Sequence, residues 1–258
     1  MGKELDFFWF SGTGNTLRIV REMAGIFEEN GYQVNLLPIT RNKPLEYRPG
    51  SLLGIGFPVA EQGTYPAVWN FIENLPDGGG APVFMVDTMM LYSGGVKGPV
   101  GKILRKKNFL LKGAREIRMP NNFFKKRNSP RKDSLLLEKG LTVAREYAEA
   151  LLAGRSRWRD IPLYSDWMAS FSRKQKTWDY FLNKFPLRVA KERCAGCGLC
   201  ERLCPAGSIS MAGGFPGFGK GCWYCMRCFS LCPSRAIGYG SSRNLRYSAV
   251  KSSELIER

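Results

Sequence analysis

Short apolar runs alternate with amphipathic stretches along the first 153 residues. Runs of strand-like length occupy residues 5–10, 32–39, 51–57, 82–86 and 115–119, and helical spacing of apolar positions spans residues 15–29, 66–75, 96–107 and 134–153. Strands that alternate with helices predict right-handed crossovers and a parallel sheet covered on both faces. The pattern therefore predicts a doubly wound α/β domain of five strands, with a ligand at the carboxyl ends of the strands.

The first predicted strand ends in a turn of small and hydroxyl-bearing residues. The turn consists of Ser11, Gly12, Thr13, Gly14, Asn15 and Thr16, and a predicted helix begins within it. Successive backbone N–H groups and a helix N-terminus favour an anion at such a turn. The lysine of the nucleoside-triphosphate loop is missing, and Leu17 replaces the third glycine of the dinucleotide motif. The turn therefore favours a phosphomonoester such as a flavin mononucleotide tail, and a capped helix start is the alternative.

This hexapeptide resembles the flavodoxin phosphate loop, [ST]-x-T-G-x-T, and matches it at each specified position. The resemblance implies that FMN binds here, with its isoalloxazine ring between the loops after the third and fourth strands, residues 58–65 and 88–95. Neither loop carries an obvious Trp and Tyr pair to enclose the ring, so ordinary surface loops are the alternative. The resemblance assigns to the flavin Pro58, Val59, Ala60, Thr88, Met89, Met90, Tyr92, Ser93 and Gly94.

All eight cysteines lie between residues 194 and 232, in two runs of the form C-x2-C-x2-C-x3-C-P displaced by 28 residues. This internal duplication is the signature of bacterial ferredoxins, in which the fourth cysteine of each run ligates the other cluster. It implies one 4Fe-4S cluster on Cys194, Cys197, Cys200 and Cys232, and a second on Cys222, Cys225, Cys228 and Cys204. Structural zinc is the alternative, but zinc knuckles do not require the third cysteine or the Cys-Pro step.

The whole chain resembles bacterial and archaeal flavodoxin-ferredoxin fusion proteins. The expected fold is a flavodoxin-like doubly wound five-stranded parallel sheet over residues 1–153, followed by a small α+β bacterial ferredoxin-like domain over residues 191–240. Residues 154–190 form an aromatic and basic helical linker, and residues 241–258 a C-terminal tail. The resemblance implies electron transfer between FMN and two 4Fe-4S clusters.

Within the second cysteine run, Arg227 either raises the reduction potential of a neighbouring cluster or faces solvent.

The linker carries apolar residues at helical spacing, at positions 167, 168, 171, 178, 181, 182 and 185. We expect this stripe to be buried between the two domains. A basic amphipathic segment on a membrane surface is the alternative.

The chain carries a formal net charge of +17 and contains no histidine. The missing histidines exclude Ser-His and Cys-His nucleophile pairs and His-ligated metals. Residues 102–132 contain twelve basic residues and only Glu116 as an acid, which favours an acidic redox partner such as a ferredoxin or a low-potential reductase. A solvated charged surface that aids solubility is the alternative. No nucleic-acid module is recognisable, so nucleic-acid binding is not expected.

No apolar run is long enough to span a membrane, and Glu4 and Asp6 oppose a signal peptide, so a cytoplasmic location is expected.

Three functional hypotheses follow in order. The first is an electron-transfer protein that relays electrons between the clusters, FMN and an external partner. The second is an FMN-dependent reductase of a small molecule fed by the clusters. The third is a basic binding module whose clusters are structural or sensory.

Overall fold

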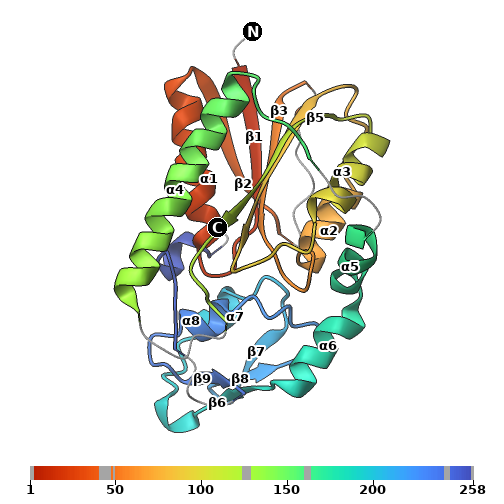
Figure 1. Cartoon of the computed structure of the whole chain (residues 1–258). Helices are drawn as coiled ribbons and strands as arrows, with labels where there is room; N and C mark the ends of the chain where they lie inside the picture. The colour runs from red at the N-terminus through yellow and green to blue at the C-terminus, as the bar shows by residue number, and fades with distance from the viewer. Residues whose placement is uncertain are drawn as a thin grey trace.

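A five-stranded parallel sheet forms the centre of the first half of the chain (Figure 1). The computed structural model describes residues 3–40, 48, 50–123, 129–159, 164–240 and 245–256, without the side chains of residues 164–166 and 168. The strands are β1 (Lys3–Trp9), β2 (Tyr32–Pro38), β3 (Leu52–Pro58), β4 (Pro82–Met89) and β5 (Leu110–Arg118). Their order, β2-β1-β3-β4-β5, is that of flavodoxin-like doubly wound sheets, with the topological switch between β1 and β3. The predicted fold of this part is confirmed.

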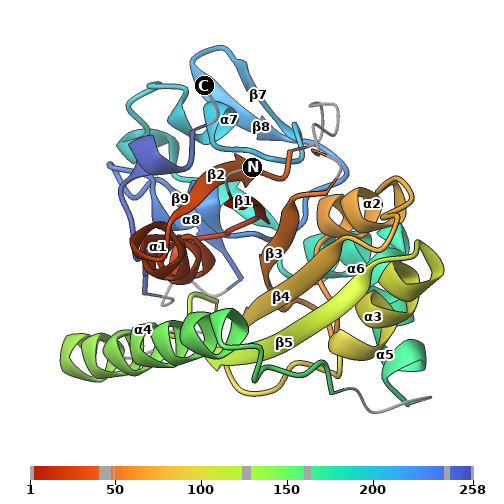
Figure 2. The same cartoon turned by 90° about the horizontal axis from the view of Figure 1, so that it is seen from above.

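Helices cover both faces of the sheet, as the parallel pairing requires (Figure 2). One face is covered by α1 (Asn15–Glu29) and α4 (Pro130–Leu152), and the other by α2 (Pro66–Glu73) and α3 (Lys97–Lys106). The apolar side of α1 packs Leu17, Val20 and Met23 against Phe7 and Phe84 of the sheet in one core. The predicted helix at 134–153 begins four residues earlier, since Pro130 is well suited to a first helical turn.

Two further helices descend from the edge of the sheet toward the second half of the chain, α5 (Tyr164–Arg173) and α6 (Gln175–Lys184) (Figure 1). Trp178 is 1% exposed and stacks on Tyr65, with ring centroids 5.3 Å apart. The expectation that the whole apolar stripe is buried is wrong, because Trp167 is 63% and Phe171 42% exposed. These two rings lie on α5 and contact each other edge-to-face, whereas the buried tryptophan lies on α6.

Residues 187–239 form a small α+β unit beyond the carboxyl edge of the sheet (Figure 1). Two antiparallel pairs, β6 (Leu187–Val189) with β9 (Ile237–Tyr239) and β7 (Ile209–Ala212) with β8 (Phe215–Phe218), flank the short helices α7 (Leu199–Arg202) and α8 (Arg227–Ser230). Two 3-10 turns, η1 (Lys191–Arg193) and η2 (Ser252–Glu254), complete the described elements. The predicted α+β character of this part is confirmed.

The two cysteine runs have the same backbone conformation. Left-handed φ angles occur at Gly196 (63°) and Gly198 (67°), and again 28 positions later at Tyr224 (53°) and Met226 (64°). The helices α7 and α8 are displaced by the same 28 residues. Left-handed backbone is unstrained for glycine but costs about 1–2 kcal/mol for other residues. The second run therefore keeps a conformation made for glycine while carrying two large side chains.

The C-terminal segment, residues 245–256, returns to the first domain. The Ala249 N–H and the Ser248 hydroxyl both donate to the Thr13 carbonyl, at 2.8 and 3.0 Å. Leu255 is buried in the core beneath α1, and Glu254 pairs with Arg21 of that helix. Within the part of the chain that the structure describes, no helix is both long and apolar enough to cross a membrane.

Candidate cofactor sites

The turn after β1 is held in one conformation from several sides. The Gly14 N–H donates to the Ser11 hydroxyl at 3.1 Å, and Gly14 adopts a left-handed φ of 97° as the N-cap of α1. The Asn122 amide donates to the Thr13 hydroxyl at 2.9 Å, and the Thr16 and Thr88 hydroxyls are 2.7 Å apart. The turn is therefore ordered by Thr88 at the end of β4 and by Asn122 after β5, as expected at the carboxyl edge of a parallel sheet.

A small cavity of about 80 Å³ lies over this turn. Among the lining residues, Ser11, Thr13 and Thr16 supply hydroxyls, and Asn121 and Asn122 supply amides. Ser11, Thr13 and Thr16 are each 1% exposed. Such a concave set of neutral donors at the start of a 15-residue helix fits a phosphate group and the hydroxylated chain attached to it.

A second cavity of about 440 Å³ adjoins the first, and the two share Val59, Tyr65 and Met90. Ala60, Met90 and Tyr92 come from the two loops that the flavodoxin resemblance assigns to the ring. The opposite wall is aromatic and comes from elsewhere in the chain: Phe123, Trp178, Phe181 and Tyr224. A large, largely apolar cavity that continues into an anion-favouring one matches the shape and polarity of FMN.

The titratable groups of the larger cavity are biased toward their neutral forms. Burial raises the pKa of Tyr65, and the charges of Cys225 and Glu61 raise it further. Burial also raises the pKa of Tyr224 and of the Glu61 carboxyl. Glu61 and Gln62 adopt left-handed φ angles of 48° and 63°, so the loop that bears the carboxyl is strained.

The thiols of the first cysteine group face a common hollow. Cys194, Cys197, Cys200 and Cys232 line one cavity together with Cys228 of the second run and apolar side chains such as Leu203 and Ile237. The Ala236 N–H donates to the Cys232 sulfur at 3.3 Å. Burial acts to raise the pKa of the Cys232 thiol, but hydrogen bonds from the Ser234 hydroxyl and the Ala236 amide outweigh it, and the net pKa is lowered. Backbone N–H donors to sulfur are the type of contact that supports thiolate ligands.

The charge of Cys204, from the first run, acts on the three thiols at Cys222, Cys225 and Cys228 of the second run. Burial raises the pKa of Cys222 to about 12, with Cys225 and Cys204 raising it further through their charges. The Ser208 N–H donates to the Cys204 sulfur at 3.3 Å, which repeats the contact at Cys232. The exchange of the fourth ligands between two clusters remains a prediction from the sequence duplication.

The second cysteine run lies directly against the phosphate turn. A Cβ at Gly12 would lie 2.6 Å from the Cys225 carbonyl oxygen, so the two backbones touch. The Arg227 guanidinium donates from Nε and Nη2 to the Ser11 carbonyl, at 3.0 and 2.9 Å, and lies over the Phe10 ring at 5.2 Å. Arg227 is 4% exposed, so the alternative in which it faces solvent is wrong. This contact brings the candidate flavin and cluster sites together.

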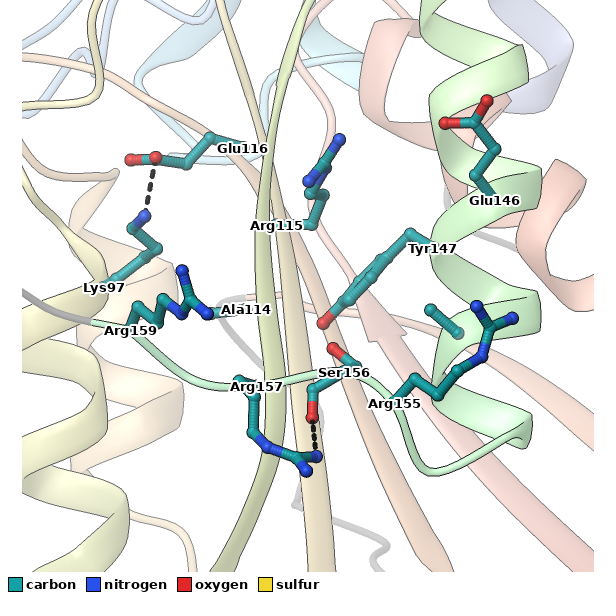
Figure 3. A pocket seen from close by; sticks show the side chains of 11 residues that line it. Lys97, Ala114, Arg115, Glu116, Glu146, Tyr147, Arg155, Ser156, Arg157 and Arg159 are labelled. Atoms are coloured by element: carbon teal, nitrogen blue, oxygen red, sulfur yellow. Dashed lines mark hydrogen bonds and ion pairs between the residues drawn. The ribbon is translucent and has the colours of Figure 1, made fainter.

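A fourth cavity, of about 470 Å³, lies between β5, α4 and the segment 155–159 and is basic (Figure 3). Five cationic side chains line it, against the two carboxylates of Glu116 and Glu146; the cations are Lys97, Arg115, Arg155, Arg157 and Arg159. Lys97 pairs with Glu116 at 2.7 Å, and the Glu116 carboxylate also accepts from the Ser93 hydroxyl. Part of the basic run predicted as a docking surface, residues 124–128, lies outside the described residues.

The predicted flavin residues fall into three groups. The small cavity is lined by Ser11, Gly12, Thr13, Asn15, Thr16, Pro58, Val59, Thr88, Met89 and Met90. Ala60 and Tyr92 line the larger one. The remaining three residues stabilise the loops. Gly14 is the N-cap of α1, and the Ser93 hydroxyl donates to Glu116. Gly94 lies so close to the neighbouring loop that a Cβ would be 2.5 Å from the Gln62 carbonyl oxygen.

Sequence reasoning missed the aromatic wall of the larger cavity and the amides of the smaller one. A signal existed for three positions. Asn121 and Asn122 follow the fifth predicted strand, at the edge where ligands bind. Tyr224 stands where the first cysteine run has Gly196, a change from the smallest side chain to a large aromatic one. Trp178 and Phe123 carried no comparable signal.

Comparisons with known proteins found one family model and several solved structures similar to parts of this chain. The model of the 4Fe-4S binding domain family matches residues 187–210. Among solved structures, a Streptococcus pneumonia flavodoxin is 15% identical, covering 58% of this chain and 98% of that one with a TM-score of 0.40. Flavodoxin 2 from Bacillus cereus is 17% identical, with coverages of 58% and 98% and a TM-score of 0.42. No curated protein matches the sequence.

Proposed function

We propose that this chain is an electron-transfer protein that binds FMN and two 4Fe-4S clusters and exchanges electrons with an external redox protein. The observation that carries the proposal is the position of Tyr224. Its side chain lines the larger cavity, while its backbone lies between Cys222 and Cys225. One loop therefore belongs to both a candidate cluster site and the candidate flavin-ring site.

The residues divide the work of binding and orientation. When bound, FMN supplies two-electron or one-electron exchange and each 4Fe-4S cluster supplies one-electron exchange. The turn from Ser11 to Thr16 would hold the phosphate, while Val59, Met90 and Tyr224 would enclose the ring. Cys194, Cys197, Cys200 and Cys232 would ligate one cluster, and Cys204, Cys222, Cys225 and Cys228 the other.

An anaerobically purified preparation tests this proposal directly. We expect flavin absorption bands superimposed on broad iron-sulfur absorption, about eight irons per chain and about one extractable FMN. Reduction by a low-potential donor should bleach both sets of bands. A preparation that contains zinc in place of iron, or that takes up no FMN on reconstitution, would refute the assignment.

The proposed partner is an acidic redox protein in the cytoplasm, such as a ferredoxin. Arg118 donates to the Met90 carbonyl at 3.3 Å beside the larger cavity, and the basic cavity next to β5 adds further positive charge. Association driven by opposite charges slows as salt screens them. We expect the rate of electron exchange with an acidic ferredoxin to fall steeply with ionic strength. A rate independent of salt would contradict this partner class.

A small-molecule reductase is the second candidate, and Glu61 is the observation that favours it. Its carboxyl lines the larger cavity, and burial raises its pKa, so it remains a proton donor at higher pH than an exposed glutamate. No histidine is available for this role. If the chain is a reductase, Glu61→Gln should slow the reduction of a benzoquinone and leave electron exchange with ferredoxin unchanged. Equal rates in the two proteins would remove this candidate.

A further inference from the structure

The buried guanidinium of Arg227 reaches beyond its own cysteine run. Nε and Nη2 donate to the Ser11 carbonyl, and Nη1 donates to the Leu255 carbonyl at 3.4 Å. Ser11 belongs to the phosphate turn and Leu255 to the C-terminal segment. The side chain thus joins the second cysteine run to two distant parts of the chain.

The contact fixes the direction of one peptide unit in the phosphate turn. The described residues contain no cis peptide bond, so the carbonyl of Ser11 and the N–H of Gly12 point in opposite directions. The carbonyl points to Arg227, and therefore the Gly12 N–H points away from it. Ser11, Gly12 and Thr13 line the small cavity, where an anion would meet that N–H group. Two charge-assisted hydrogen bonds also polarise the peptide and make its N–H a stronger donor.

The next-but-one carbonyl of the turn is held in a similar way. Thr13 accepts from the Ala249 N–H and the Ser248 hydroxyl, so a second peptide is oriented from behind the turn. The hexapeptide itself contains no cation. Arg227 supplies a buried positive charge that contacts the Ser11–Gly12 peptide through its carbonyl oxygen.

We propose that Arg227 is a positioning residue of the phosphate site, so that affinity for the phosphate of FMN depends on the loop that holds the second cluster. This inference rests on the proposed function. It adds that the two cofactor sites are thermodynamically linked through a single side chain. Linkage is reciprocal, so FMN should also protect the second cluster from loss.

Titrations with FMN and with riboflavin, which lacks the phosphate, test the inference. The proteins are the wild type, Arg227→Gln, Arg227→Lys and Phe181→Ala, all cluster-loaded. We expect Arg227→Gln to weaken FMN binding about tenfold or more and riboflavin binding less than about twofold, since hydrogen bonds to charged groups contribute most here. Arg227→Lys keeps the charge but loses the bidentate contact with the Ser11 carbonyl. Its affinity for FMN should therefore lie between those of the wild type and Arg227→Gln.

Phe181→Ala is the matched control, because Phe181 lines the ring cavity and not the phosphate cavity. It should weaken FMN and riboflavin by the same factor. A pH titration of the phosphorus-31 resonance of bound FMN is a second measurement. It needs only the wild type and Arg227→Lys, so it remains usable even if Arg227→Gln does not fold. With Arg227 in place, the pKa of the second ionisation of the bound phosphate should be lower than in free FMN.

Three outcomes decide the matter. Selective loss of FMN affinity supports the role of Arg227. Equal weakening of FMN and riboflavin, or unchanged FMN affinity in both folded Arg227 variants, overturns it. A wild-type protein that binds neither flavin refutes the proposed function itself, and the inference with it.

Discussion

Gly12 offers a direct test of the contact between the phosphate turn and the second cysteine run. In Gly12→Ala, the new Cβ would lie 2.6 Å from the Cys225 carbonyl oxygen and 3.6 Å from its carbonyl carbon. A carbon and an oxygen at rest are separated by roughly 3.3 Å, so the two backbones must part by about 0.7 Å. The obstacle is backbone rather than a flexible side chain, and the shift must therefore be shared by both loops.

We expect this substitution to destabilise the protein by about 1–3 kcal/mol, the usual cost of overpacking a close contact. In a chain of this size, that corresponds to a fall in melting temperature of about 2–10 °C. The displaced turn should also bind FMN more weakly, by about tenfold for every 1.4 kcal/mol lost in binding. Thermal unfolding and FMN titration of the anaerobic protein measure the two effects.

Gly25→Ala is the control, because it makes the same chemical change within the same domain. Gly25 lies inside α1, and a Cβ there would meet no atom within 4 Å. Alanine is favoured over glycine in a helix interior by about 0.8–1.0 kcal/mol, so this variant should gain stability. If Gly12→Ala melts at or above the wild-type temperature and binds FMN equally well, the close approach of the two loops is refuted.

Three further predictions concern other parts of the molecule. Burial raises the pKa of Asp87 well above its usual range, Glu116 adds to this and Lys97 opposes it; the folded state therefore retains a proton that the unfolded chain releases above about pH 4. Wild-type stability should fall as pH rises from there, and Asp87→Asn should gain stability at neutral pH, with the gain shrinking toward pH 4 in denaturant titrations. Cys204→Ser should halve the iron content and remove the cluster of the second run, as judged by electron paramagnetic resonance with Cys222→Ser for comparison; loss of the first-run cluster instead would show that the runs do not exchange ligands. Trp178→Ala should cost about 3–5 kcal/mol and Trp167→Ala within about 0.5 kcal/mol in urea unfolding, since only the first ring is buried; similar losses would contradict the packing of α6.

Local patterns in the sequence predicted the elements and motifs that depend on neighbouring residues. Periodicity alone predicted the first four strands and the helices over 15–29 and 96–107, whereas β5 begins at Leu110, five residues before the run predicted at 115–119. The turn at Ser11 follows from its position between a strand and a helix. The cysteine spacing also predicted that the backbone conformation of the first run recurs in the second. The short helices α7 and α8 are accordingly displaced by the same 28 residues.

Contacts between distant segments were beyond this reasoning. Periodicity identifies an apolar face but not what covers it, which is why the exposure of Trp167 and Phe171 was not foreseen. The wall formed by Trp178 and Tyr224 depends on how the second unit docks on the sheet edge. The burial of Arg227 has the same origin, since its partner Ser11 is 216 residues away.

The return of the C-terminal segment to the first domain makes the peptide connection between α4 and α5 dispensable for cohesion. Thr13 is hydrogen-bonded to Ala249, and Arg21 is paired with Glu254. The first domain and the C-terminal segment are therefore held together by contacts that do not involve the linker. A protein nicked by a protease after α4 should consequently migrate as one particle under native conditions. Its two fragments should reassemble when mixed, and neither alone should retain the whole outer support of the turn at Thr13.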